Sequence, residues 1–169
     1  MNELIRVLNG QFNSLRIKSF LQKGYSDVEI GKIENLYGFK IKDNIQLYEF
    51  LNTIGRCSGG FFGSSPLIFY SDLSIRMHVV FQGHINYEML SAEKEIECKE
   101  DSFIISVENN NEYYFLYYKD GLVYCFNKKE DRVESTGKTF NEYLLSVIER
   151  YSISADPDSL YATGELIIV

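Results

Sequence analysis

Few residues of this chain combine the type and the spacing that catalysis or ligand binding requires. The glycine-rich segment from Gly55 to Ser65 could cradle a phosphate, but a phosphate-binding loop places a Lys-Ser/Thr pair after its second glycine and precedes a helix. Here no such lysine is present, and the segment follows an expected helix. Nucleotide or other small-ligand binding is therefore kept only as the last alternative for the function.

Other candidate chemical groups have structural explanations. His78 and His84 are the only histidines, and no closely spaced metal ligands accompany them. Cys57 could pair with either histidine as a hydrolase, but nothing in the sequence orients a base or builds an oxyanion hole. Glu29 and Glu34 could perform acid–base work, yet Glu29 is better explained as a helix cap. We therefore expect no catalytic residue, no metal site and no cofactor, and a protein that is not an enzyme.

Three helices have start signals of one kind, a capping residue placed three positions before a Glu or Gln. The pairs are Ser26 with Glu29, Asp43 with Gln46, and Thr139 with Glu142. They predict helices over about 26–37, 43–54 and 139–150. An imperfect apolar stripe predicts a further helix over 2–22, and the charges of 87–96 favour a helix there.

Short apolar runs predict the strands. They cover 67–70, 72–81, 102–107, 112–118, 122–127 and 132–136. Three consecutive asparagines, 109–111, indicate a turn, and Asp120-Gly121 is a strong hairpin signal. Consecutive strands with helices before and after them indicate an α+β domain, with a mainly antiparallel sheet of about four to six strands packed against helices.

The order of these parts resembles the SUKH superfamily, which contains fungal cell-wall-synthesis regulators and bacterial toxin-immunity proteins. The resembling elements run from Gly24 through Glu29-Ile30, Ile33-Glu34, Gly38-Phe39-Lys40-Ile41 and Tyr48-Glu49-Phe50-Leu51 to Gly55. The final helix resembles the family pattern at Thr139-Phe140-Asn141-Glu142-Tyr143-Leu144-Leu145. Two departures are Ile41-Lys42 in place of Leu-Pro and Ile54-Gly55 in place of Asn-Gly. The resemblance covers roughly residues 20 to 150, so we expect one SUKH-like domain over 1–151 and a C-terminal extension over 152–169.

Composition restricts the class of partner. The chain has a net charge of −7, and such an acidic protein repels nucleic-acid backbones while attracting basic partners. The alternative is that the charge serves solubility alone. No apolar run is long enough for a membrane span, the first residues do not form a signal peptide, and three widely spaced cysteines do not suggest a disulfide framework. We expect a cytoplasmic protein of bacterial origin.

Candidate partner-binding residues are exposed aromatic and acidic positions. Phe61 and Phe62 cannot easily both be buried from one loop, so one could anchor a partner; the alternative is that both pack beneath the loop. The tyrosines near the hairpin alternate between the two sheet faces and could form an aromatic, acidic binding face, or else a thick aromatic core. The candidates are Phe61, Phe62, Tyr70, Asp72, Glu112, Tyr114, Tyr118 and Asp120.

These observations lead to an expectation about function. The resemblance implies a non-enzymatic protein-binding module, an immunity protein that neutralises a cognate bacterial toxin by covering it. The toxin would be a basic domain, for example a nuclease. The first alternative keeps the same fold but makes the protein a regulatory scaffold that binds host proteins.

Overall fold

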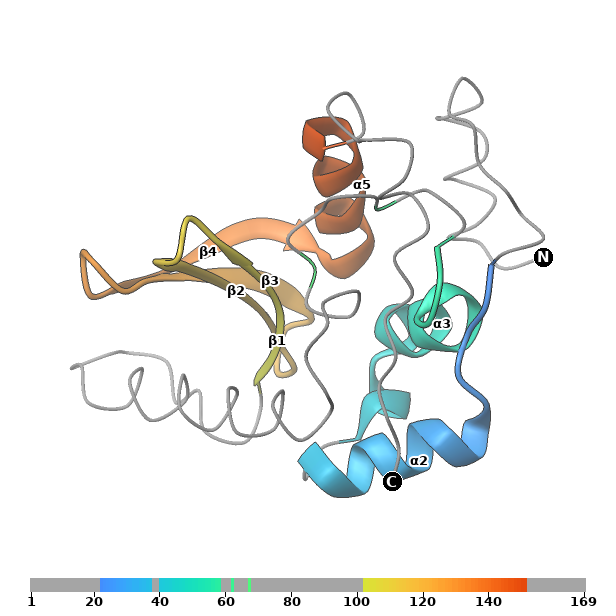
Figure 1. Ribbon diagram of the computed structural model, residues 1–169. Coiled ribbons are helices and arrows are strands. Elements are labelled where there is room, and N and C mark those ends of the chain that lie inside the picture. The colour runs from blue at the N-terminus through green and yellow to red at the C-terminus, as the bar shows by residue number, and fades with distance from the viewer. Residues whose placement is uncertain (1–21, 38–39, 59–61, 63–66, 68–101, 152–169) are drawn as a thin grey trace.

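The computed structural model describes residues 22–37, 40–58, 62, 67 and 102–151 (Figure 1). Several expected elements lie outside these residues: the helix over 2–22 apart from Gln22, the strand over 67–70 apart from Leu67, the strand over 72–81, the segment 87–96 and the extension 152–169. The described elements form an α+β arrangement. They are α2 (Asp27–Tyr37), the short 3₁₀ helix η2 (Ile41–Asp43), α3 (Ile45–Ile54), β1 (Ser102–Glu108), β2 (Glu112–Tyr117), β3 (Leu122–Asn127), β4 (Arg132–Thr139) and α5 (Phe140–Tyr151).

The four described strands form an antiparallel sheet in the order β1-β2-β3-β4. The asparagine turn at 109–111 and the Asp-Gly hairpin lie where the sequence predicts them. Asn109, Asn110 and Gly121 have φ values of 52°, 59° and 73°, and Asn and Gly are the residues that adopt this left-handed backbone most readily. Each turn is therefore selected locally, which fixes the pairing of the strands that it joins.

A bulge in β1 directs side chains toward the helices. The register shifts between Ile104 and Ser106, so that Ile105 and Ser106 both lie on the helix-facing side. Ile105 is buried in the main core with Leu116 of β2 and Val123 of β3. Ser106 instead uses its hydroxyl to make a hydrogen bond with the Tyr143 hydroxyl of α5.

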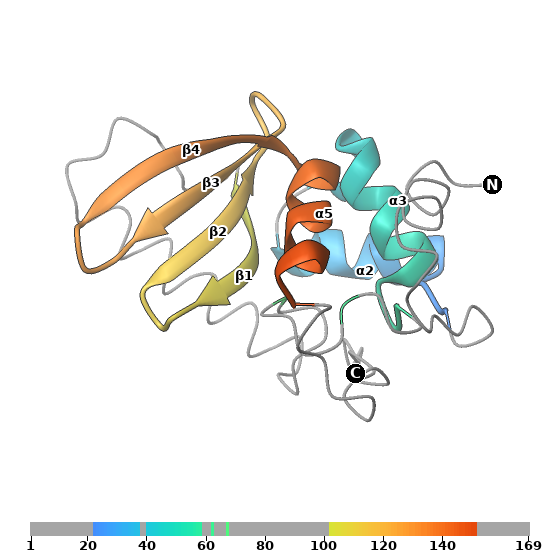
Figure 2. The ribbon, with the colours of Figure 1, turned by 90° about the horizontal axis from the view of Figure 1, so that it is seen from above.

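Helix α5 lies between the sheet and the pair α2 and α3, and contacts both the sheet and α3 (Figure 2). Phe50 of α3 packs edge-to-face on Phe140 of α5, with 5.5 Å between ring centroids, and on Phe62 at 5.9 Å. Edge-to-face pairing places the positive ring edge on the negative ring face. The main core therefore joins the two sides of the molecule through aromatic contacts.

Two of the three predicted helix caps are confirmed. The Ser26 N–H donates to the Glu29 carboxylate at 2.8 Å, and the Thr139 N–H donates to Glu142 at 2.8 Å. The expected cap at Asp43 is wrong: the Asn44 side chain accepts the Leu47 N–H at 3.0 Å. Asp43 instead ends η2, so the helix begins one capping residue later.

The tyrosines had two alternative interpretations, and the side of the sheet away from α5 holds a second buried cluster. Tyr113 and Phe126 stack with centroids 6.1 Å apart, and Phe115 stacks on Tyr124 at 5.8 Å. Phe115 is fully buried and Tyr113 is only 7% exposed. The alternative of a thick aromatic core therefore describes this face.

Candidate functional site

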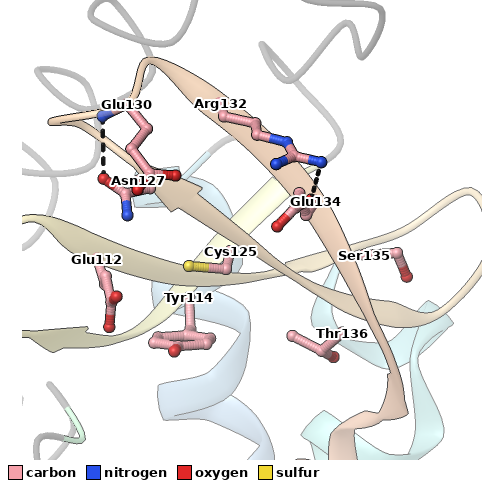
Figure 3. Close-up of a pocket in the computed structure, with 9 residues that line it drawn as sticks. All are labelled: Glu112, Tyr114, Cys125, Asn127, Glu130, Arg132, Glu134, Ser135 and Thr136. Atoms are coloured by element: carbon pink, nitrogen blue, oxygen red, sulfur yellow. Dashed lines mark hydrogen bonds and ion pairs between the residues drawn. The ribbon is translucent and has the colours of Figure 1, made fainter.

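A pocket opens on the helix-facing side of the sheet, at the end where the turns 109–111 and 128–131 lie (Figure 3). It has a volume of about 290 Å³. We call it the acidic pocket. Its lining residues come from β2, β3, β4 and the turn before β4: Glu112, Tyr114, Cys125, Asn127, Glu130, Arg132, Glu134, Ser135 and Thr136.

Strand register brings these side chains together. Tyr114 of β2 pairs with Cys125 of β3, and Cys125 pairs in turn with Glu134 of β4. The next row, two residues nearer the turns, pairs Glu112 with Asn127 and Asn127 with Arg132. Directly paired residues share a sheet face, so the two rows form one polar surface across three strands.

Tyr114 connects this surface to the core. Its ring lies 5.2 Å from the ring of Tyr143 in α5, measured between centroids, and the side chain is half-buried. Desolvation raises the pKa of its hydroxyl, and the Glu108 and Glu112 carboxylates raise that pKa further. The wall of the pocket nearest α5 is therefore an aromatic ring with a neutral hydroxyl.

The lining carries an excess of negative charge. It contains Glu112, Glu130 and Glu134 against one basic residue, Arg132. The pKa of the Cys125 thiol is raised to about 11, first by desolvation and then by neighbouring carboxylates that include Glu112 and Glu134. Cys125 therefore stays a protonated and unreactive thiol at neutral pH. The same carboxylates that disfavour a negatively charged thiolate would favour a bound cation in the pocket.

One guanidinium already lies at the rim. Arg132 forms an ion pair with Glu134 two residues along β4, and their side chains are 64% and 56% exposed. An ion pair this exposed contributes at most about 1 kcal/mol. Asn127 faces the same rim and accepts the N–H groups of Lys129 and Glu130 at 3.0 and 3.1 Å, which orders the turn before β4.

The structure brings together two of the residues predicted from sequence, Glu112 and Tyr114. Tyr118 and Asp120 lie at the opposite end of β2, in and around the hairpin turn. Burial raises the pKa of the half-buried Tyr118, and the carboxylates of Asp43 and Glu34 raise it further. These two candidates therefore do not share a site with the first two.

Asp120 is exposed, but its side chain shapes the hairpin. One carboxylate oxygen accepts the Leu122 N–H at 2.9 Å, and the other accepts the Tyr124 hydroxyl at 2.7 Å. This bond raises the pKa of Tyr124. A carboxylate that bonds two residues on in this way holds a turn in place.

The remaining candidates fall in or near the glycine-rich loop. Phe62 is only 2% exposed and packs on Phe50, so it belongs to the core as the packing alternative expects, and its interpretation as an exposed anchor is wrong. Phe61, Tyr70 and Asp72 lie outside the described residues.

Sequence reasoning missed most of the pocket lining. Glu134, Arg132 and Thr136 alternate along β4, and Cys125 and Asn127 alternate along β3. Alternation was the available signal, but it assigns residues to a common face only after the register of all three strands is known.

The described residues hold no group of three His, Cys, Asp or Glu side chains suited to a metal ion. Among them there is also no helix with the length and apolar character needed to cross a membrane. The pocket itself offers hydrogen bonds, negative charge and an aromatic ring to a ligand.

Comparisons with family models, curated proteins and solved structures found no match to this chain.

Proposed function

We propose that this protein is a non-enzymatic binding module of the SUKH type, an immunity protein that binds and neutralises a cognate bacterial toxin domain. The observation that carries the proposal is the acidic pocket, which three carboxylates and a half-buried tyrosine line together on one sheet face. Tyrosine is among the residues that contribute most at protein interfaces, and carboxylates select a basic partner.

The proposed mechanism is occlusion. The protein would bind over the toxin's active site, or hold the toxin in an inactive form, with no bond made or broken. Its net charge of −7 would speed the encounter with a basic toxin, for example a nuclease domain, because opposite charges steer association. This charge complementarity is the reason for preferring a toxin that itself binds a polyanion.

The decisive experiment uses a candidate toxin domain encoded by a neighbouring gene. Its activity is measured with rising amounts of the purified protein, at low and at high salt. The proposal expects activity to fall to background at equimolar protein, with slower association at high salt. Full toxin activity at saturating protein would overturn it.

Two other outcomes point to the alternatives. A stable complex with a housekeeping enzyme, together with no effect on the toxin, would support a regulatory scaffold. A reproducible thermal shift with a nucleotide or another small ligand, without toxin inhibition, would support a ligand-binding domain. Each result contradicts the immunity function and identifies the class that replaces it.

A further inference from the structure

The size of the acidic pocket limits what can enter it. Its volume of about 290 Å³ is roughly twice that of the ~150 Å³ cavity that binds benzene in an engineered protein core. This is room for one long side chain and a few waters, and too little for a folded segment of a partner. The pocket therefore suits the tip of a single residue that projects from a partner's surface.

The walls differ in chemistry, and each suits a different part of a guanidinium. The Tyr114 ring provides an aromatic surface beside α5. Glu112 and Glu134 lie in adjacent rows of the three-strand surface, and Figure 3 shows Glu112 beside Tyr114 on the same side of the sheet. A planar cation that stacks on the ring can donate to a carboxylate at its edge.

The chain itself shows that a guanidinium fits at the rim. Arg132 reaches Glu134 from the same strand, and both side chains are more than half exposed. Because so exposed a pair contributes little to stability, a guanidinium that enters from outside can share or replace the bond to Glu134 at low cost. Glu112, by contrast, has a weak contact with the Asn109 amide at 3.5 Å.

We propose that the acidic pocket receives an arginine side chain of the partner protein, stacked on Tyr114 and bonded to Glu112 and Glu134. This inference rests on the proposed function, and it identifies the partner group that the site recognises. Arginine suits the pocket better than lysine, because its guanidinium is planar, weakly hydrated and able to bond a carboxylate through two N–H groups. A lysine ammonium would keep more of its water and gain less from the ring.

The pocket can be tested without the toxin, using the blocked amino acid N-acetyl-arginine amide as the probe. The full chain is titrated with it, and amide chemical shifts are followed by NMR. Saturable shifts are expected at β2 to β4 around Tyr114 and Cys125, with weaker binding of the lysine analogue and none of the uncharged citrulline analogue. The double variant Glu112→Gln/Glu134→Gln should weaken binding by about tenfold or more.

Asp43→Asn is the matched control, since it also removes an exposed carboxylate but lies near Tyr118, at the other end of β2. It should leave binding of the probe unchanged. Tyr114→Phe should retain binding through the ring, and Tyr114→Leu should lose it; thermal unfolding of both shows whether the fold is intact. Equal shifts in the wild type and the double variant, or equal binding of arginine and citrulline, would overturn the inference.

The two proposals fail in different ways. If the toxin is neutralised equally well by the wild type and by Glu112→Gln/Glu134→Gln, the immunity function stands and the arginine pocket is wrong. If the probe binds as expected but the toxin keeps its activity, the pocket stands and the immunity function is wrong.

Discussion

Arg150, near the end of α5, holds Glu108 of β1 through two charged hydrogen bonds. Its Nη1 lies 2.7 Å from Glu108 Oε2, and its Nη2 lies 3.0 Å from Oε1. Glu108 is only 6% exposed, and its Oε1 also accepts the Tyr143 hydroxyl at 3.3 Å. A charged group on the helix thus satisfies a buried carboxylate on the strand and fixes how α5 lies on the sheet.

Replacing Arg150 with methionine should therefore destabilise the protein. The apolar stem is kept, but Glu108 loses the guanidinium that compensates its burial. We expect a loss of about 2–3 kcal/mol in the free energy of unfolding, somewhat below the loss for a fully buried pair because Arg150 is 42% exposed on its side chain. Urea unfolding at neutral pH measures this change.

The double variant Glu108→Leu/Arg150→Met provides the control for that ion pair. With both charges removed, no carboxylate is left buried without its cation, so most of the lost stability should return. If the double variant is instead less stable than Arg150→Met, the ion pair makes a net contribution to stability that exceeds the cost of burying Glu108.

The two confirmed capping boxes predict a pH dependence of stability. Hydrogen bonds from the Ser26 N–H and hydroxyl lower the pKa of Glu29 below its ordinary value of 4.5, and Arg56 lowers it further. The N–H and hydroxyl of Thr139 lower the pKa of Glu142 in the same way. The folded state then binds fewer protons than the unfolded state. The stabilisation by the two ionised carboxylates is therefore fully present above about pH 4.5, and it is lost as the pH falls below that value.

Glu29→Gln/Glu142→Gln removes both titrating groups while keeping a side chain that can cap. The variant should lose less stability than the wild type between about pH 6 and about pH 3. The urea midpoint, measured at several pH values, checks the difference in slope. Identical slopes for the two proteins would contradict a capping role for the ionised carboxylates.

Phe50→Leu should weaken the core that joins α3 to α5. The shorter side chain loses both edge-to-face contacts, with Phe140 and with Phe62, and leaves part of the ring volume empty. We expect a loss of about 1–2 kcal/mol in unfolding free energy. Val28→Ala, at a residue that is 71% exposed, should change it by less than about 0.5 kcal/mol. Thermal unfolding compares the two variants.

Local signals explain why much of the fold could be predicted. Ser26 and Glu29 are three residues apart, as are Thr139 and Glu142. Their capping hydrogen bonds therefore depend mainly on local sequence. The cap of α3 was predicted at Asp43 instead of Asn44 because both are good capping residues. The choice between them depends on burying Ile41 in η2 and Leu47 in α3, which is a tertiary contact.

The acidic pocket could not be predicted, because it depends on contacts between strands. Glu134 lies in the row of Tyr114 only because both pair with Cys125, and this register of β4 on β3 ends at a shift between Val123 and Tyr124. Strand β4 also continues to Thr139, past Gly137 with φ 67°, whereas the sequence indicated an end at Thr136. A single residue of slippage would have moved the carboxylates to the other face.

Gly24 and Gly31 offer a last prediction, because the same substitution should act in opposite directions at the two sites. A Cβ atom on Gly24 would lie 1.7 Å from the Asn52 carbonyl oxygen. Two hydrogen bonds of the next residue maintain that close approach: the Tyr25 N–H donates to the Leu51 carbonyl at 2.8 Å, and the Asn52 amide donates to the Tyr25 carbonyl at 3.0 Å.

Gly24→Ala should therefore separate the segment before α2 from α3, costing about 3 kcal/mol or more in unfolding free energy and breaking both hydrogen bonds. A Cβ on Gly31, in the middle of α2, meets nothing within 4 Å. Gly31→Ala should stabilise the protein by about 0.5–1 kcal/mol, because alanine restricts the unfolded chain and favours helix. Urea unfolding of both variants is the measurement. Equal effects at the two sites would mean that backbone entropy alone sets the outcome, and that Gly24 is not required for the close packing of this segment on α3.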